Sequence, residues 1–366
     1  MKVGIIGRGL MGSAAARHLA KAGADVTLIG PSEPADKRSH RGAFGSHYDE
    51  GRITRHNASN PFWVEVSKAS IARYEEIEEE GGVAFFAEVG ALMAGGDAWM
   101  ARVDAAAAAH GVESHALDSG GLAETFPFFE FPGGYSGAYE RRRAGHVSPR
   151  RLVAAQTAAA TRHGATLVET EVRSVTEGGA VETSQGRISF DQILVTAGGW
   201  TDAILGRPAM LDVYARTVAL FEIDAGEAAR LKSMPSLVWE APEDPYLLPP
   251  IMYPDGKTYV KLGGDPEDVR LDGPQAVGDW FRSGGNADVR DRLEEMIRAL
   301  MPSLDIRSVT MDACVTSWTP DRMPEIRRLG ERVAVCTGGN GAGAKCSDEL
   351  GRRGAALVGE KIGVAV

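Results

Sequence analysis

Three glycines near the start of the chain have the spacing that binds a dinucleotide. Gly7, Gly9 and Gly12 form a G-x-G-x-x-G pattern between an apolar run at residues 2–6 and strong helix formers at residues 13–22. In this pattern the first glycine makes a tight turn, the second lets the backbone approach a phosphate, and the third lets helix and strand pack closely. The helix start also offers free N–H groups to an anion. The spacing therefore predicts a pyrophosphate-binding turn.

The residue that would bind the adenosine ribose is less clearly marked. The acidic residue that usually ends the second strand of such a unit is absent, because Gly30 occupies that position. Glu33 follows Gly12 by about twenty residues, which is near the spacing of the motif. Glu33 either reaches the ribose hydroxyls from the loop or is a solvated loop carboxylate, and the sequence leaves both open.

A strand, a helix and a second strand must carry this turn. The runs at residues 2–6, 13–22 and 24–29 supply them. The loop that follows, residues 31–57, is crowded with glycine, histidine and arginine, and such loops beside a phosphate-binding turn are commonly functional. We expect a helical stretch at residues 61–80.

The rest of the chain alternates between two kinds of structure. Ser148 and Pro149 provide an N-cap and a first-turn proline for a helix that ends before Gly164. The strand-like runs within residues 211–309 predict an antiparallel sheet that covers a pocket. We expect strands at residues 166–172, 180–184, 192–196, 213–223, 237–239, 258–262 and 333–336, and helices at residues 99–109, 289–300 and 347–358, the last with Ser347 as its N-cap.

Composition limits the classes of function. The 366 residues are 43% hydrophobic and 25% charged, as in soluble globular proteins, and allow two domains. With 50 acidic and 40 basic residues, the chain is not expected to bind nucleic acid, which requires an excess of lysine and arginine. No apolar run is long enough for a membrane span and no leader precedes the first strand, so we expect a cytoplasmic protein. Cys314, Cys336 and Cys346 are too few and too irregularly spaced for a disulfide framework or a zinc site.

Nearly the whole chain resembles the FAD-dependent amine and amino-acid oxidases, a family that includes monomeric sarcosine oxidase, N-methyltryptophan oxidase and pipecolate oxidase. The ordered co-occurrence of several motifs carries the resemblance. These motifs are the glycine turn at 7–12, residues 45–56 (GSHYDEGRITRH), Ala197-Gly198-Gly199-Trp200, Lys261-Leu262-Gly263, Cys314 with Thr319-Pro320-Asp321, and Gly341-Ala342-Gly343-Ala344-Lys345.

The resemblance implies roles for four cations. Arg52 is expected beside the flavin, while Arg55 and Lys345 bind the substrate carboxylate from two sides. A guanidinium suits that task because it forms two parallel charge-assisted hydrogen bonds and stays protonated. Lys261 matches the lysine that assists oxygen over the flavin face, where positive charge favours electron transfer. Residue type alone leaves other positions open: Arg52 and Arg55 could face solvent or brace the loop, Lys345 could be a plain helix-start lysine, and Lys261 could point outward from an alternating strand.

Cys314 matches the cysteine that forms a thioether to the flavin in the sarcosine oxidases. By residue type alone it would be a small buried hydrophobe. The resemblance therefore implies FAD, covalently attached through Cys314. The other residues that it assigns to the cofactor are Gly7, Gly9, Leu10, Met11, Gly12, Glu33, Ser46, Arg52, Val172, Gly198, Gly341, Gly343, Ala344 and Lys345.

Two positions depart from the family pattern. Asp265 replaces a substrate-side histidine, and Thr316 replaces the tyrosine two residues after the flavin-linked cysteine. Both positions shape the pocket around the amine, so a sarcosine-like substrate does not follow. Asp265 either meets a cationic or polyhydroxylated side group or lies outside the pocket.

The resemblance implies an α/β fold in which a Rossmann-like FAD-binding domain of the glutathione-reductase type is interleaved with an α+β substrate domain on an antiparallel sheet. We expect residues 1–82, 146–210 and 310–366 in the first domain, and residues 83–145 and 211–309 in the second. The implied function is oxidation of an amino acid or N-alkyl amino acid to an imine, with O₂ reduced to H₂O₂, by a monomer or small homo-oligomer. The alternatives are an FAD-dependent dehydrogenase of an amino or 2-hydroxy acid with a quinone or carrier-protein acceptor, and a non-catalytic FAD-binding sensor.

Overall fold

The computed structural model describes residues 1–58, 60–207 and 210–366. The helices are α1 (Leu10–Lys21), α2 (Pro61–Ile71), α3 (Tyr74–Gly81), α4 (Asp97–His110), α5 (Ser119–Thr125), α6 (Pro149–Arg162), α7 (Thr201–Leu205), α8 (Ala225–Arg230), α9 (Gly273–Ser283), α10 (Ala287–Leu300) and α11 (Gly343–Ile362). The strands are β1 (Lys2–Ile6), β2 (Asp25–Ile29), β3 (Arg52–Thr54), β4 (Phe86–Ala87), β5 (Ala91–Gly95), β6 (His115–Leu117), β7 (Ser136–Glu140), β8 (Gly145–Val147), β9 (Thr166–Val168), β10 (Val172–Val175), β11 (Ala180–Thr183), β12 (Gly186–Ser189), β13 (Gln192–Val195), β14 (Asp212–Ile223), β15 (Ser236–Trp239), β16 (Tyr246–Met252), β17 (Thr258–Gly263), β18 (Ser308–Trp318), β19 (Glu325–Arg328) and β20 (Val333–Thr337).

A six-stranded sheet carries the predicted phosphate-binding turn. Its strand order is β19-β20-β13-β1-β2-β9, with β1 parallel to both of its neighbours. After Lys2 every residue of β1 is buried, as expected for a central parallel strand covered on both faces. Helix α1 connects β1 to β2, so the predicted strand–helix–strand unit is confirmed.

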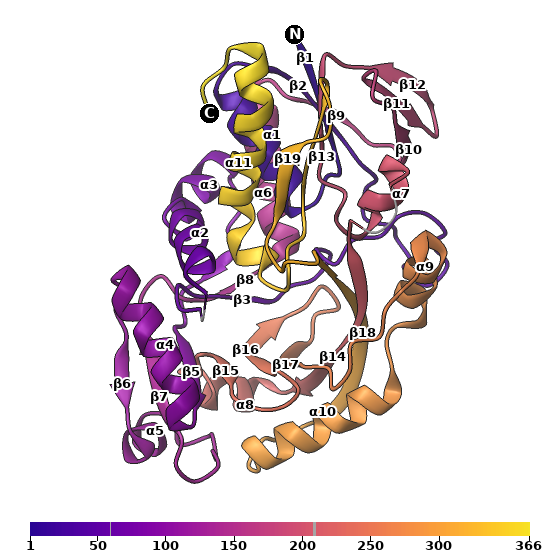
Figure 1. The fold of residues 1–366 in the computed structure, drawn as a ribbon. Helices are drawn as coiled ribbons and strands as arrows, with labels where there is room; N and C mark the ends of the chain where they lie inside the picture. The colour runs from indigo at the N-terminus through magenta and orange to yellow at the C-terminus, as the bar shows by residue number, and fades with distance from the viewer. Residues whose placement is uncertain (59, 208–209) are drawn as a thin grey trace.

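Three helices from distant parts of the chain lie together beside this sheet (Figure 1). Helix α1 contacts both α6 and α11. Ala14, Ala15 and Ala16 of α1 are completely buried, and their small side chains let the helices approach closely. Helix α6 begins as predicted, because the Ser148 hydroxyl accepts the N–H of Arg151 at 3.2 Å.

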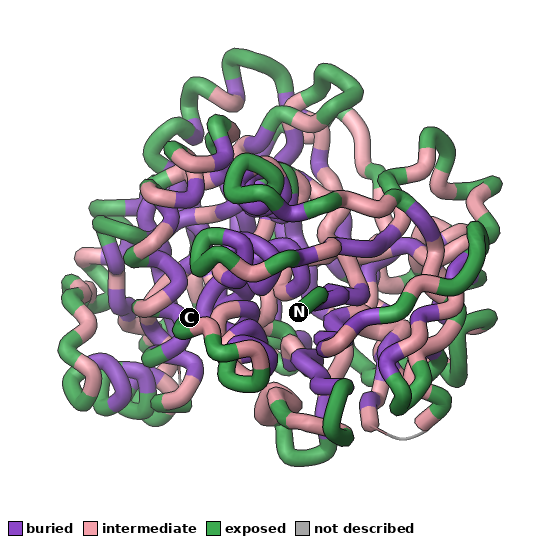
Figure 2. Tube along the Cα trace, turned by 90° about the horizontal axis from the view of Figure 1, so that it is seen from above, coloured by how far each residue is buried: buried purple, intermediate pink, exposed green. Residues whose placement is uncertain are grey.

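An eight-stranded sheet forms the lower half of the molecule in Figure 1. Its order is β18-β14-β17-β16-β15-β5-β7-β6, and all pairs are antiparallel except β15 with β5. The predicted antiparallel sheet is therefore confirmed, with one parallel pair. Phe221 and Leu262 on this sheet share a buried core with Leu293 and Ile297 of α10. Seen from above, the buried residues lie beneath exposed loops, and both termini lie at this surface (Figure 2).

A small sheet lies between the two large ones (Figure 1). Strand β8 pairs antiparallel with β3 and with β4, so that Ile53 lies opposite His146. Two of the predicted cations depend on β3, since Arg52 begins the strand and Arg55 directly follows it. This sheet was not predicted from the sequence, because its strands are only two or three residues long.

Some boundaries differ from the predictions. The expected helix at 61–80 is two helices, α2 and α3, interrupted at residues 72–73. The prediction of Ser347 as an N-cap is wrong, because α11 starts at Gly343 and the Ser347 hydroxyl donates to the carbonyl of Ala344 at 2.9 Å inside the helix. Strand β18 pairs within the eight-stranded sheet, although the proposed division assigns most of it to the nucleotide domain.

Candidate functional site

The glycine turn is held from both sides. The N–H of Gly7 donates to Ile29 of β2 at 2.9 Å, and the hydroxyl of Thr196 donates to the carbonyl of Gly7 at 2.9 Å. Gly7 has φ +109°, a conformation that favours glycine. A Cβ atom on Gly12 would collide with the Gly7 carbonyl oxygen, so only glycine lets α1 begin this close to β1. The turn thus has the geometry that its spacing predicts.

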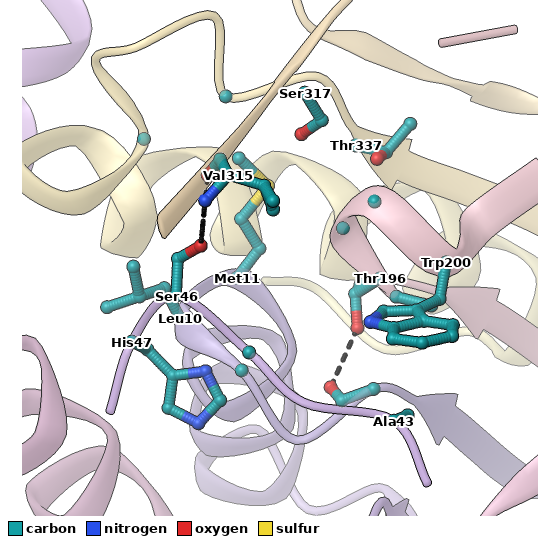
Figure 3. Close-up of a pocket in the computed structure, with 18 of the residues that line it drawn as sticks. Leu10, Met11, Ala43, Ser46, His47, Thr196, Trp200, Val315, Ser317 and Thr337 are labelled. Atoms are coloured by element: carbon teal, nitrogen blue, oxygen red, sulfur yellow. Dashed lines mark hydrogen bonds between the residues drawn. The ribbon is translucent and has the colours of Figure 1, made fainter. Parts of the chain in front are cut away.

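A cavity of about 280 Å³ extends from this turn. Figure 3 shows Leu10 and Met11 at the turn, Ser46 and His47 on the following loop, and Val315 and Ser317 on β18 around it. The Ser46 hydroxyl joins two of these segments, since it accepts the N–H of Val315 at 3.0 Å and donates to its carbonyl at 2.9 Å. The predicted cofactor residues that line the cavity are Gly7, Gly9, Leu10, Met11, Ser46, Arg52, Val172, Gly198, Cys314, Gly341, Gly343 and Ala344.

Three arginines lie around the end of the cavity near the glycine turn, and each is paired with a carboxylate: Arg8 with Glu169, Arg52 with Asp49, and Arg150 with Glu33 and Glu50. His47 lines the cavity, and burial lowers the pKa of His47 to about 3, with further lowering by the charges of Arg150, Arg8 and Arg52. The imidazole is therefore neutral at physiological pH, and the three arginines act on the same space. The N-terminus of α1 at the turn suits an anionic pyrophosphate, because helix N-termini attract negative charge.

Three predicted cofactor residues lie outside the cavity wall: Gly12, Glu33 and Lys345. Gly12 lies under the turn, where its role is packing. The carboxylate of Glu33 accepts two hydrogen bonds from Arg150, at 2.8 Å and 2.7 Å. Since this bidentate pair occupies both oxygens of Glu33, its binding to a ribose stays a prediction.

Arg52 and Cys314 meet at the cavity wall. The guanidinium of Arg52 donates to the Cys314 sulfur at 3.3 Å and to the carbonyl of Ser46 at 3.1 Å. Cys314 is 9% exposed, and its carbonyl accepts the indole N–H of Trp280 at 2.8 Å. These contacts fix the position of the Cys314 thiol on β18, at the cavity wall and next to the Arg52 guanidinium.

Lys261 is completely buried on β17 and does not line the cavity. Its ammonium forms an ion pair with Asp49 and donates to the carbonyl of Gly51 at 2.9 Å. Asp49 also pairs with Arg52 and accepts the hydroxyl of Tyr253 at 3.0 Å. Burial, followed by the charge of Arg52, lowers the pKa of Lys261. Lys261 therefore reaches the cavity wall through Asp49 and Arg52.

Arg55 and Lys345 form a second pair of cations. Lys345 is 6% exposed and donates to the hydroxyl of Ser67 at 2.6 Å. Arg55 is half-buried, its guanidinium donates to the carbonyl of Asn57, and its Nε has no partner. Among the described residues neither cation forms an ion pair. Burial lowers the pKa of both, and the charge of Arg55 lowers that of Lys345 further, so the two lie within electrostatic range.

Sequence reasoning missed two carboxylates that hold these cations in place. Asp49 lies within the quoted motif at 45–56, but its pairing with Lys261, 212 residues later, depends on the fold. Glu140 ends β7, is 1% exposed, and accepts the backbone N–H groups of His56 and Asn57 at 2.9 Å and 2.8 Å. A glutamate at the end of a short strand gives no signal by itself.

The two departures from the family pattern lie at different places. Thr316 lines the cavity, and its hydroxyl accepts the indole N–H of Trp318 at 2.9 Å. Asp265 follows β17 and does not line the cavity, and its carboxylate accepts the N–H of Thr217 at 3.2 Å. Burial raises the pKa of Asp265 to about 6, although the nearby Arg216 opposes that rise.

The cavity suits a dinucleotide. The turn at Gly7 and Gly12 fits only without side chains, and α1 begins at its edge. These features match the charge and the close backbone approach of a pyrophosphate. The thiol and guanidinium of Cys314 and Arg52 stand on the wall where β18 closes the cavity.

No group of three or more histidine, cysteine, aspartate or glutamate side chains among the described residues is arranged to hold a metal ion. Within residues 1–58, 60–207 and 210–366, every helix is too short or too polar to cross a bilayer. The cytoplasmic location and the monomeric or small homo-oligomeric state stay predictions.

Comparisons with known proteins agree with this geometry. A family model described as FAD dependent oxidoreductase (DAO) matches residues 2–357. Monomeric sarcosine oxidase of Bacillus sp. (strain NS-129) is 24% identical over 360 residues, covering 95% of this chain and 90% of that protein. N-methyl-L-tryptophan oxidase of Yersinia pestis (strain Pestoides F) is 25% identical over 372 residues, covering 98% and 94%. The solved structure of NikD, an unusual amino acid oxidase, has the same fold, with a TM-score of 0.77 at 20% identity over 98% of this chain and 94% of that chain.

Proposed function

Because the chain belongs to the DAO family of FAD-dependent oxidoreductases, we propose that it is an oxidase of an amino acid or N-alkyl amino acid. It oxidises the C–N bond of this substrate to an imine and reduces O₂ to H₂O₂. The relatives named sarcosine oxidase and N-methyl-L-tryptophan oxidase support this class of donor.

The observation that carries the proposal is that neither Arg55 nor Lys345 forms an ion pair within the described residues, although the charge of buried Glu140 acts on both. Buried cations in proteins are normally paired, because an isolated charge is costly to remove from water. Other buried cations of this chain follow that rule: Arg17 pairs with Glu76 and Glu80, and Lys261 pairs with Asp49. Arg55 and Lys345 are suited to an anion that comes from outside the chain, and a substrate carboxylate is such an anion.

The residues of the chain then act by binding and orientation. Arg55 and Lys345 hold the carboxylate from two sides, which fixes the direction of the adjacent C–H bond. When bound, FAD accepts the hydrogen and two electrons that leave the C–N unit and passes the electrons to O₂. A substrate amine that binds neutral needs no strong base, and positioning with charge compensation supplies most of the catalysis.

The cofactor is held by the residues of the cavity. We propose that the turn at Gly7, Gly9 and Gly12 binds the pyrophosphate and that Arg52 lies beside the flavin. Cys314 would form a thioether to the 8-methyl carbon of the ring: its S–H bond and one methyl C–H bond break, an S–C bond forms, and the two electrons and two protons go to O₂ to give H₂O₂. The buried thiol on the cavity wall next to Arg52 supports this attachment point. Gly341, Gly343 and Ala344, where the chain enters α11, also line the cavity. Lys261 assists the reaction with oxygen.

Anaerobic titration tests the proposed function. The purified yellow protein is mixed with a panel of N-methyl, cyclic and sugar-linked amino acids, and the flavin absorbance is followed before and after air is admitted. We expect at least one donor to bleach the wild type, air to restore the colour with formation of H₂O₂, and Arg55→Met to abolish bleaching at the same donor concentration. A protein that no amino acid bleaches would refute the assignment.

Acid precipitation tests the covalent link separately. We expect the flavin of the wild type to stay with the precipitated protein and that of Cys314→Ser to be released. Cys336→Ser serves as the control, since Cys336 is completely buried beneath α11 and its sulfur donates to the carbonyl of Leu350 at 3.3 Å. If the Cys314→Ser protein keeps its flavin after precipitation, the attachment point is wrong.

The pairing of Lys261 with Asp49 favours a second candidate, a dehydrogenase of an amino or 2-hydroxy acid with a quinone or carrier-protein acceptor. A neutralised ammonium outside the cavity wall exerts less of the field that favours oxygen. Lys261→Met distinguishes the two, because an oxidase loses its reaction with O₂ steeply while a dehydrogenase keeps its rate with a quinone. Stopped-flow mixing of the reduced protein with either acceptor measures both rates.

A further inference from the structure

Asn57 has a buried side-chain amide whose two polar atoms are unpartnered within the described part of the chain. The residue is 1% exposed, and neither Nδ2 nor Oδ1 forms a hydrogen bond among the described residues. Its backbone is fully used, because the N–H donates to Glu140 at 2.8 Å and the carbonyl accepts from Arg55. Burying an amide without partners is unfavourable, and each such group in a folded protein calls for an explanation.

The amide cannot turn to solvent for its hydrogen bonds. Glu140 fixes the segment by accepting the N–H groups of both His56 and Asn57, and it also contacts the His56 ring at 3.0 Å. Three residues later Asn60 caps α2, with its side chain accepting the N–H of Phe62 at 2.9 Å. The contacts with Glu140 therefore hold the backbone at His56 and Asn57.

The same segment contains the unpaired guanidinium. Arg55 Nε is also buried and has no hydrogen-bond partner in residues 1–58, 60–207 and 210–366, and Arg55 stands two residues before Asn57. The charge of Arg55 lowers the pKa of Lys345, and Lys345 has no carboxylate partner among the described residues. Two cations and one amide with unused hydrogen-bonding capacity thus belong to one region of the structure.

We propose that Asn57 is a substrate-contacting residue that recognises a hydrogen-bond donor beside the substrate carboxylate. This inference rests on the proposed carboxylate site at Arg55 and Lys345. A carboxylate only accepts hydrogen bonds, so it satisfies the two cations and Nδ2 but leaves Oδ1 unpaired. Oδ1 requires an N–H or O–H group on the ligand.

The substrate class follows from this requirement. Amino acids with a primary or secondary amine carry an N–H next to the carboxylate, whereas N,N-dialkyl amino acids in the neutral form do not. A site built to bind a donor rejects the analogue that lacks it, because the protein group is then left unpaired. Asn57 selects primary and N-monoalkyl amino acids against their N,N-dialkyl analogues.

Isosteric carboxylates test the proposal without turnover. Glycolate and propionate have nearly the same shape and charge, but only glycolate has a donor beside the carboxylate. Isothermal titration calorimetry on the FAD-loaded protein gives both dissociation constants. We expect wild-type protein to bind glycolate more tightly by about tenfold, and Asn57→Leu, which keeps the side-chain shape, to bind the two equally.

Control variants separate recognition from structure. Asn60→Leu removes the cap of α2, so it lowers the melting temperature while the preference for glycolate stays that of the wild type. If the Asn57→Leu protein does not fold, Asn57→Ala replaces it in the titration, and we expect it too to lose the preference for glycolate over propionate.

Three results would overturn the inference. Equal binding of glycolate and propionate by the wild type removes the donor recognition but leaves the carboxylate site standing. An unchanged preference in Asn57→Leu or Asn57→Ala shows that another group makes the discrimination. If neither ligand binds the wild type, the proposed carboxylate site at Arg55 and Lys345 is refuted, and the proposed role of Asn57 is refuted as well.

Discussion

Replacement of Lys345 with methionine should weaken carboxylate binding and at the same time stabilise the substrate-free protein. Lys345 is 6% exposed, and its ammonium has the Ser67 hydroxyl and the Cys346 sulfur as its hydrogen-bonding partners. Methionine has a similar length and no charge, so it fits the same buried space. If the replacement raises the stability of the protein and weakens carboxylate binding, Lys345 serves ligand binding rather than the fold.

The two magnitudes follow from the contacts. A charge-assisted hydrogen bond contributes about 1.5–3 kcal/mol, so loss of the one to the carboxylate raises the dissociation constant about 10- to 150-fold. Removing a buried cation that has no carboxylate partner raises the free energy of unfolding by about 1–2 kcal/mol.

The stability difference should also depend on pH. Burial lowers the pKa of Lys345 below its usual value of 10.5, so the unfolded chain keeps its proton over a range in which the folded chain releases it. Wild-type stability therefore rises with pH through that range, up to about pH 10.5. The variant lacks this titration, and its advantage over the wild type should shrink as the pH approaches 10.5.

Urea denaturation between pH 7 and 10.5, together with calorimetric binding of propionate, measures both effects. Lys361→Met is the matched control, because Lys361 is exposed near the end of the same helix and should change neither quantity. A Lys345→Met protein that binds propionate like the wild type, or that is less stable by several kcal/mol, would show that Lys345 serves the fold rather than a ligand.

Three further variants test other parts of the structure. Gly12→Ala should prevent retention of FAD on gel filtration, since its Cβ collides with the carbonyl of Gly7; a fully yellow variant would contradict this. Asp348→Asn should lower the free energy of unfolding by about 3 kcal/mol or more, because buried Asp348 accepts from His18, Gln156 and Arg73. These contacts lower the pKa of Asp348, so wild-type stability is lost as pH falls below 3.8, and the variant should lack that loss in urea titrations. Burial raises the pKa of Asp265 to about 6, so the free energy of unfolding falls as the pH rises from 3.8 to 6. Asp265→Asn should remove this pH dependence in urea titrations, and an unchanged dependence would show that another group titrates.

Local patterns determined the parts of the fold that depend on neighbouring residues. The turn at Gly7 to Gly12 was predictable because each glycine is required by contacts within one strand–helix–strand unit. The start of α6 was predictable for the same reason, since the Ser148 cap bonds three residues ahead. The start of α11 was not, because the serine at 347 carries a capping signal that the real start at Gly343 overrides.

The sequence by itself determined which residues could hold a dinucleotide and, through ordered motifs, which cations could meet a carboxylate. Only the tertiary structure decided which of those cations are already paired. Lys261 meets Asp49 across 212 residues, whereas Arg55 and Lys345 meet no carboxylate among the described residues. The physical reason is that pairing of a buried charge depends on which side chains distant segments bring within a few ångströms, and spacing along the chain does not encode that distance.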